Sequence, residues 1–100
     1  MNSIELKLDA NQNGAFVIED GDQRLAEMAI SLDGPNLIVY HTEVSEALQG
    51  QGIASKLLAQ MVDYARKNNL KVIPRCPYVH AQFKRHREQY ADIWNKSWKP

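Results

Sequence analysis

The chain has 100 residues, 44% of them hydrophobic and 24% charged, and its acidic and basic side chains balance to a formal net charge of +0. This apolar content excludes a disordered segment, and the length predicts one domain, residues 1–100, that can bury a single modest core. The single cysteine excludes an internal disulfide, which favours a reducing compartment.

The sequence carries no sign of a membrane segment or of secretion. No apolar run approaches the ~20 residues that a spanning helix needs. Residues 1–10 alternate in polarity where a signal peptide would have an apolar block. We therefore expect a cytoplasmic protein without a membrane partner.

Charge is distributed unevenly along the chain. Residues 1–48 hold two basic and nine acidic side chains, a balance of −7, whereas residues 49–100 hold ten basic and three acidic side chains, a balance of +7. A basic half suits an anionic ligand, and an acidic half attracts a cationic amine. The alternative is that solvated faces of the fold have segregated by charge without a functional consequence.

Four segments of alternating polarity predict a meander of β-strands. These strands are expected over residues 3–8, 15–19, 24–32 and 37–44. Turn signals rich in Gly, Asn, Asp and Pro separate them at residues 11–14, 20–22 and 33–36. The fourth segment begins apolar on both faces, which is typical of a buried central strand. The exposed edge of the first strand would allow pairing between copies, so we expect a monomer or weak dimer.

Two helices and a fifth strand are predicted in the second half. Apolar residues recur at the spacing of one helix face at Ile53, Leu57, Leu58, Met61 and Ala65. Asn68 and Asn69 end this helix, because asparagine tolerates the left-handed cap conformation. The crossover predicts that a fifth strand, residues 70–74, pairs in parallel with the fourth. A second helix follows over residues 78–94, which gives an α+β (α/β) fold in the order β-β-β-β-α-β-α with a mixed, mostly antiparallel sheet.

The turn before the first helix is a candidate anion site. Gly50 and Gly52 let the backbone approach a ligand closely, and the first helical turn presents unpaired N–H groups at the positive end of the helix dipole. Strand, glycine-containing turn and helix together make a cradle suited to a pyrophosphate. The alternative is a tight turn in which the glycines only relieve backbone strain.

In a sheet with parallel strands, ligands bind beyond the carboxyl ends of those strands. His41 lies near the end of the fourth strand with Val39 and Glu43 expected on the same face, and Cys76 follows the fifth strand beside Arg75. We expect His41, Cys76 and the loop amides to converge, which would suit acid–base or nucleophilic chemistry. The alternatives are a structural histidine and a buried, inert thiol.

Two other clusters are weaker candidates for a functional site. His41, Cys76, His80 and His86 lack any standard zinc-ligand spacing, so no metal is expected. The basic run at residues 84–87 forms either a solvated face or a phosphate contact. Although Trp94 and Trp98 follow this run, so short a run on a neutral chain argues against a nucleic-acid partner.

Two motifs relate the chain to a known family. The first is Gln-x-x-Gly-x-Ala, which runs from Gln49 through Gly52 to Ala54, and the second is Arg-Cys-Pro-Tyr-Val over residues 75–79, with Phe83 four residues later. With the element order, these motifs resemble the compact branch of the GCN5-related N-acetyltransferases (GNAT), the YjdJ-type N-acetyltransferase domain. The resemblance covers nearly the whole chain.

The resemblance implies a minimal GNAT fold in which the two parallel strands splay apart to admit acetyl-CoA. The amides from Gln51 to Ala54 should bind its pyrophosphate, and its pantetheine should run along the fourth strand toward the catalytic residues His41 and Cys76. Cofactor-binding residues for acetyl-CoA or coenzyme A would be Thr42, Glu43, Val44, Gln49, Gly50, Gln51, Gly52, Ile53, Ala54, Ser55, Lys56, Cys76, Tyr78, Lys84 and Arg85, with His86 beside them.

The function that this resemblance implies is acetyl transfer from acetyl-CoA to a primary amine of a small molecule, a lysine side chain or a peptide N-terminus. His41 would remove a proton from the ammonium, directly or through water. Cys76 would donate a proton to the leaving thiolate or carry the acetyl group transiently. The alternatives are a non-catalytic module that binds CoA or acyl-CoA, and an interaction domain that has lost its ligand.

Overall fold

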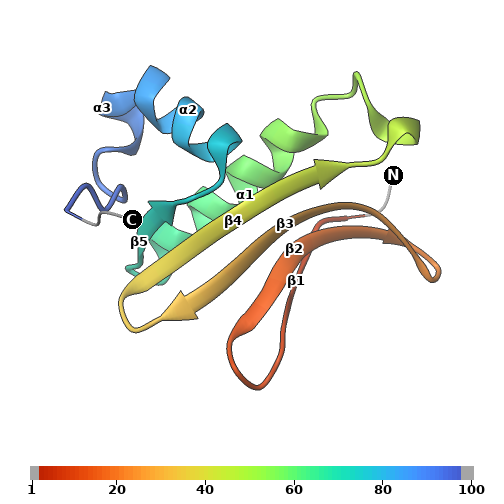
Figure 1. Ribbon diagram of the computed structural model, residues 1–100, viewed down its shortest axis with the longest axis horizontal. Coiled ribbons are helices and arrows are strands. Elements are labelled where there is room, and N and C mark those ends of the chain that lie inside the picture. Colours follow the sequence, from red (N-terminus) through yellow and green to blue (C-terminus); the bar gives the residue numbers. More distant parts are fainter. Residues whose placement is uncertain (1–2, 98–100) are drawn as a thin grey trace.

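The computed structural model describes residues 3–97, and its centre is a five-stranded sheet in the order β1-β2-β3-β4-β5 (Figure 1). The strands are β1 (Glu5–Leu8), β2 (Asn13–Asp20), β3 (Gln23–Asp33), β4 (Asn36–Val44) and β5 (Lys71–Pro74). The first four pair antiparallel, and β5 pairs in parallel with β4. The predicted α+β class, the meander and the parallel fifth strand are confirmed. Trp98 lies outside the described residues.

The helices follow the sheet in the chain. They are the short 3₁₀ helix η1 (Glu46–Leu48) and the α-helices α1 (Ile53–Lys67), α2 (Pro77–Arg85) and α3 (Arg87–Tyr90). Asn69, just beyond α1, has a φ of 54°, so the left-handed residue predicted at this helix end is confirmed. The prediction of one second helix over residues 78–94 is wrong, because His86 interrupts it with a φ of −122° and a ψ of 53°.

After α3 the chain returns to the outer edge of β5. The Val72 N–H donates to the Ile93 carbonyl at 2.6 Å, and the Asn95 N–H donates to the Val72 carbonyl at 2.9 Å. These bonds satisfy backbone groups that an edge strand would otherwise leave unpaired. The C-terminal segment therefore extends the sheet where the sequence predicted helix.

α1 packs on one face of the sheet. Its buried stripe is Ile53, Leu57, Leu58, Met61, Val62 and Ala65, which confirms the predicted apolar spacing and adds Val62. These residues share one core with inward-facing side chains of β2, β3 and β4, and Tyr64 meets Phe16 edge-on at 5.9 Å between ring centroids. Val79, Phe83 and Tyr90 join the same core, so α2 and α3 are anchored to α1 and the sheet.

A β-bulge at Tyr40 changes which side chains of β4 face the core. Ile30 pairs with Val39, but Ala29 pairs with His41, so Tyr40 is an extra residue in β4. A bulge of this kind shifts the alternation of side chains by one position. Val39 is therefore buried at 0% exposure, whereas His41 is exposed. The prediction that Val39, His41 and Glu43 share one face is wrong for Val39.

β4 and β5 separate at one end. Their parallel pairing runs only from Asn36 opposite Lys71 to Val39 opposite Pro74, while β4 continues to Val44. The last bond across this gap joins the Cys76 N–H to the Val39 carbonyl at 2.8 Å. The edge of β4 from Tyr40 to Val44 is thus open toward the start of α2, which is the splay expected of the fold. Among residues 3–97, no helix has the length and apolar character of a membrane span.

Candidate functional site

The loop that leads into α1 has the conformation of an anion cradle. Gly50 and Gly52 have φ values of 81° and 70°. These values lie in the left-handed region, which residues other than glycine rarely adopt. Gly52 is the N-cap of α1 and offers no side chain to its free N–H groups. A Cβ atom on either glycine would meet no other atom within 4 Å. The left-handed glycines and the helix N-terminus without a side-chain cap therefore fit a pyrophosphate, which such loops bind through backbone N–H groups.

The two glutamines of the loop contact the backbone that precedes it. The Gln49 Nε2 donates to the Val44 carbonyl, and the Gln51 Nε2 donates to the Ala47 carbonyl, both at 3.5 Å. These long bonds tie the loop to the end of β4 and to η1. The glycine amides are thereby held beside the open edge of β4.

The open end of the splay contains Thr42 and Cys76. The Thr42 Oγ1 lies 3.4 Å from the Cys76 Sγ, and the thiol-bearing residue is only 2% exposed. Tyr78 is the second residue of α2, and its burial raises its pKa, with smaller contributions from Tyr90 and Cys76. A phenol with a raised pKa remains protonated at neutral pH and can donate a hydrogen bond. Thus both Cys76 and Tyr78 are candidate proton donors on the core side.

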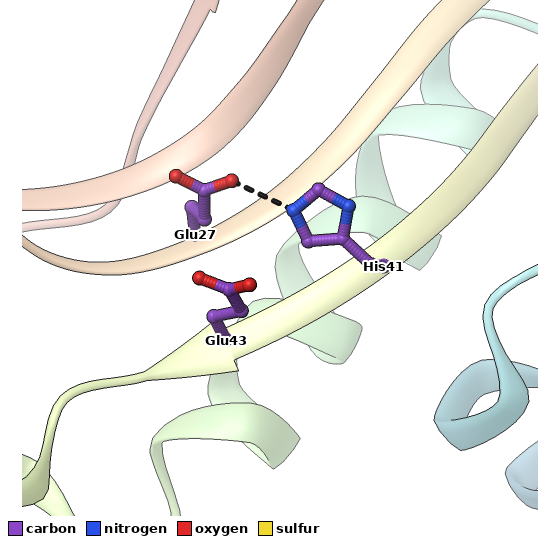
Figure 2. A group of neighbouring side chains, drawn as sticks. All are labelled: Glu27, His41 and Glu43. Atoms are coloured by element: carbon purple, nitrogen blue, oxygen red, sulfur yellow. Dashed lines mark hydrogen bonds and ion pairs between the residues drawn. The ribbon is translucent and has the colours of Figure 1, made fainter.

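His41 belongs to a different cluster on the other face of the sheet. Its Nε2 lies 2.9 Å from the Glu27 Oε2, and Glu43 is the cross-strand partner of Glu27 (Figure 2). One ligand atom from each of these three residues lies within 4.8 Å of the other two. Figure 2 shows the three side chains in front of the sheet with α1 behind it. The His41 and Glu27 side chains are 49% and 24% exposed, so solutes can reach them.

The structure does not bring the side chains of His41 and Cys76 together. His41 and Thr42 are consecutive in a strand, so their side chains point to opposite faces, and Thr42 is the one that meets Cys76. The predicted convergence of His41, Cys76 and the loop amides is therefore wrong for His41. Sequence reasoning also missed Glu27, which only the strand register places beside His41.

The predicted phosphate-contacting residues at the end of α2 line a separate hollow. Lys84, Arg85, His86, Arg87, Glu88 and Gln89 surround a volume of about 500 Å³. A neighbouring groove of about 390 Å³ is lined by residues of α1, including Ser55, and by Gln89 and Tyr90 of α3. Gln89 borders both depressions, so they adjoin between α1 and the basic run. Lys84, Arg85 and Arg87 face one carboxylate, that of Glu88, in the first hollow, a balance that suits an anionic ligand.

Comparisons with known proteins agree with this geometry. The family model described as GCN5-related N-acetyl-transferase matches residues 15–93. The chain is also similar to the NMR solution structure of a GCN5-like candidate N-acetyltransferase from Staphylococcus aureus. The two chains are 34% identical with a TM-score of 0.68, over 94% of this chain and 90% of the other. No curated protein matches the chain at a significant level.

Proposed function

The chain belongs to the GCN5-related N-acetyltransferase family, and from this premise we propose that it transfers the acetyl group of acetyl-CoA to a primary amine. The observation that carries the proposal is the left-handed Gly50–Gly52 loop at the N-terminus of α1, beside the unpaired end of β4. A helix N-terminus binds pyrophosphate, and an open strand edge hydrogen-bonds an extended amide chain. Acetyl-CoA has both parts.

The residues that hold acetyl-CoA in this proposal lie along one path. The amides from Gln51 to Ala54 bind the pyrophosphate, with Ser55 and Lys56 at the same helix end. The backbone from Thr42 to Val44 pairs with the pantetheine, and Lys84 and Arg85 contact the adenosine phosphates. Bound acetyl-CoA supplies the activated acetyl thioester. A free N–H of β4 polarises its carbonyl.

The acceptor amine approaches the opposite face of the sheet. Glu27 and Glu43 attract its ammonium form, and His41 accepts the proton that the nitrogen must lose before it attacks. Glu27 orients the imidazole through its 2.9 Å contact with Nε2. In the transfer the new N–C bond forms as the C–S bond breaks. Cys76 then donates a proton to the departing sulfur, with Tyr78 as the alternative donor.

The burial of Cys76 favours a second candidate function, a module that binds CoA or acyl-CoA without catalysis. A thiol that is 2% exposed is shielded from solvent, which is common for inert structural cysteines. The discriminating result is acetyl-CoA binding without acetyl transfer to a panel of polyamines, lysine peptides and small primary amines.

The test of the proposed function is calorimetric titration of acetyl-CoA into wild type, Gly52→Val and Gly34→Val. Both glycines have positive φ and open space around them, so each substitution costs a similar ~1–2 kcal/mol of stability. Gly34 lies in the β3–β4 turn, remote from the loop. We expect wild type and Gly34→Val to bind and Gly52→Val to lose binding. Equal binding by all three chains, or none by wild type, contradicts the proposal.

A further inference from the structure

The cluster of Glu27, His41 and Glu43 has the donor set of a divalent metal site. It is the one group of three or more His, Cys, Asp or Glu residues within residues 3–97 whose ligand atoms lie so close together. One imidazole nitrogen and two carboxylate oxygens match the preferences of zinc, which takes nitrogen and oxygen ligands in tetrahedral geometry. Magnesium and calcium prefer shells of oxygen atoms only, so they fit this set less well.

The strands fix the positions of the three ligands. Glu27 and Glu43 are direct cross-strand partners, and His41 is two residues from Glu43 on the same face of β4. The His41 Nε2 and Glu27 Oε2 are already 2.9 Å apart. Two ligands of one tetrahedral zinc, with bonds of ~2.1 Å, are separated by ~3.4 Å. Small side-chain rotations therefore complete the site without moving the backbone.

The surroundings of the cluster also suit a metal ion. The two facing carboxylates repel each other, and the Glu43 side chain makes no hydrogen bond or ion pair within residues 3–97. The Glu27 Oε1 faces Arg24 Nη1 at 3.4 Å, an outer contact that orients the carboxylate while Oε2 stays available. The half-exposed His41 leaves room for ion entry and for water as a fourth ligand.

We propose that Glu27, His41 and Glu43 bind one Zn²⁺ on the exposed face of the sheet. Zinc on Nε2 replaces the proton that this nitrogen donates to Glu27. The coordinated imidazole then carries its proton on Nδ1, which can no longer accept one from the substrate. If the proposed function holds, on which this consequence alone rests, zinc competes with the acceptor ammonium and inhibits acetyl transfer. Binding itself requires neither acetyl-CoA nor catalysis.

Zn²⁺ alone is titrated into the full chain in competition with a chromophoric chelator. We expect one ion per chain in wild type and a zinc affinity at least about tenfold lower in Glu43→Gln. Removal of a residue that only hydrogen-bonds a metal ligand already lowers metal affinity by about that factor. Glu43→Gln keeps the side-chain shape and breaks no side-chain hydrogen bond or ion pair of the described residues. The matched control is Glu5→Gln, which removes a carboxylate two strands away on the same sheet face and should bind like wild type.

Imidazole NMR spectra of the same samples identify the ligand. Zinc should shift the ring signals of His41 and leave those of His80 and His86 unchanged. Absence of binding, equal binding by Glu43→Gln, or shifts confined to His80 and His86 would each overturn the site. Acetyl transfer is assayed separately with and without zinc. A chain that binds zinc through His41 but shows no transfer loses the proposed function and keeps the metal site.

Discussion

His41 and Thr42 are neighbours in the chain, yet their side chains point to opposite faces of the sheet. His41 meets Glu27 on the exposed face, and Thr42 meets Cys76 on the core face. Both residues lie where β4 has lost its pairing with β5. A group bound in this gap is therefore accessible to a proton acceptor from one face and to a proton donor from the other, which is what amine acetylation requires.

Substitution of His41 tests the acceptor side. We expect His41→Gln to lower turnover by ~10²–10³-fold, the usual contribution of a positioned base, without changing acetyl-CoA affinity. Steady-state transfer rates and calorimetry measure the two effects. The control is His80→Gln, which removes an exposed histidine whose ring meets that of Trp94 edge-on. Equal losses in both variants would show that His41 has no special role.

Substitution of Cys76 tests the donor side. Serine keeps the size of the side chain but holds its proton too tightly to donate it, so Cys76→Ser should lose at least ~100-fold in transfer and retain acetyl-CoA binding. Circular dichroism checks that the buried position still folds. Full activity in Cys76→Ser would assign the donation to Tyr78. Tyr78→Phe should then be the variant that loses acetyl transfer.

At the scale of elements, periodicity predicted the stripe of α1 and the strand meander, because burial of one face imposes those repeats. The bulge at Tyr40 left no such signal. If the register next to the β3–β4 turn continued without a bulge, Glu27 would pair with Thr42, and His41 would lie on the core face opposite Met28. The observed register instead pairs Glu27 with Glu43. One inserted residue thus decides which side chains form the candidate site.

The break at His86 likewise could not be predicted from spacing. In a continuous helix Phe83 and Tyr90 would be separated by ~10.5 Å along the axis, two turns apart. Their rings actually stack at 4.6 Å between centroids. That contact requires the chain to turn between α2 and α3. Tertiary packing of two aromatic rings therefore overrides a local pattern that favours one long helix.

Arg66 joins α1 to the segment after α3. Its guanidinium contacts both Asp92 carboxylate oxygens, at 3.0 Å and 3.2 Å, and donates to the Gln89 carbonyl at 2.7 Å. Because the groups are largely exposed, we expect Arg66→Ala to lower the free energy of unfolding by only about 1 kcal/mol at pH 7. Urea unfolding measures this, and Lys67→Ala, whose ion pair with Asp63 stays within α1, should cost less.

The contribution of this ion pair depends on pH in a definite direction. Hydrogen bonding to Arg66 lowers the pKa of Asp92 in the folded chain. The stabilisation is therefore complete above the unfolded-state pKa of ~3.9 and is lost as pH falls through the lower folded-state value. The difference between wild type and Arg66→Ala should shrink toward pH 2. A difference that persists there would assign the effect to the Gln89 contact instead.

At the scale of the whole molecule, the acidic and basic halves of the chain form different parts of the fold. The acidic residues 1–48 form β1 to β4 and η1, whereas the basic residues 49–100 supply all three α-helices and β5 (Figure 1). The helices hold the loop and basic run proposed for acetyl-CoA, and the sheet holds the carboxylates proposed for the amine. If the proposed function holds, the molecule thus separates the site of its anionic ligand from the site of its cationic acceptor.

This separation predicts that acetyl-CoA affinity falls as ionic strength rises, since exposed charges more than ~10 Å apart are screened at 0.1 M salt. The double variant Lys84→Gln, Arg85→Gln should bind more weakly by about 0.5–1 kcal/mol per charge at low salt and should show a shallower salt dependence. Lys67→Gln, which removes an exposed charge at the far end of α1, is the matched control. Calorimetry at several salt concentrations measures the slopes. If the double variant and the control give the wild-type slope, the basic run does not contact the phosphates, and the binding energy must come from the loop amides and the open edge of β4.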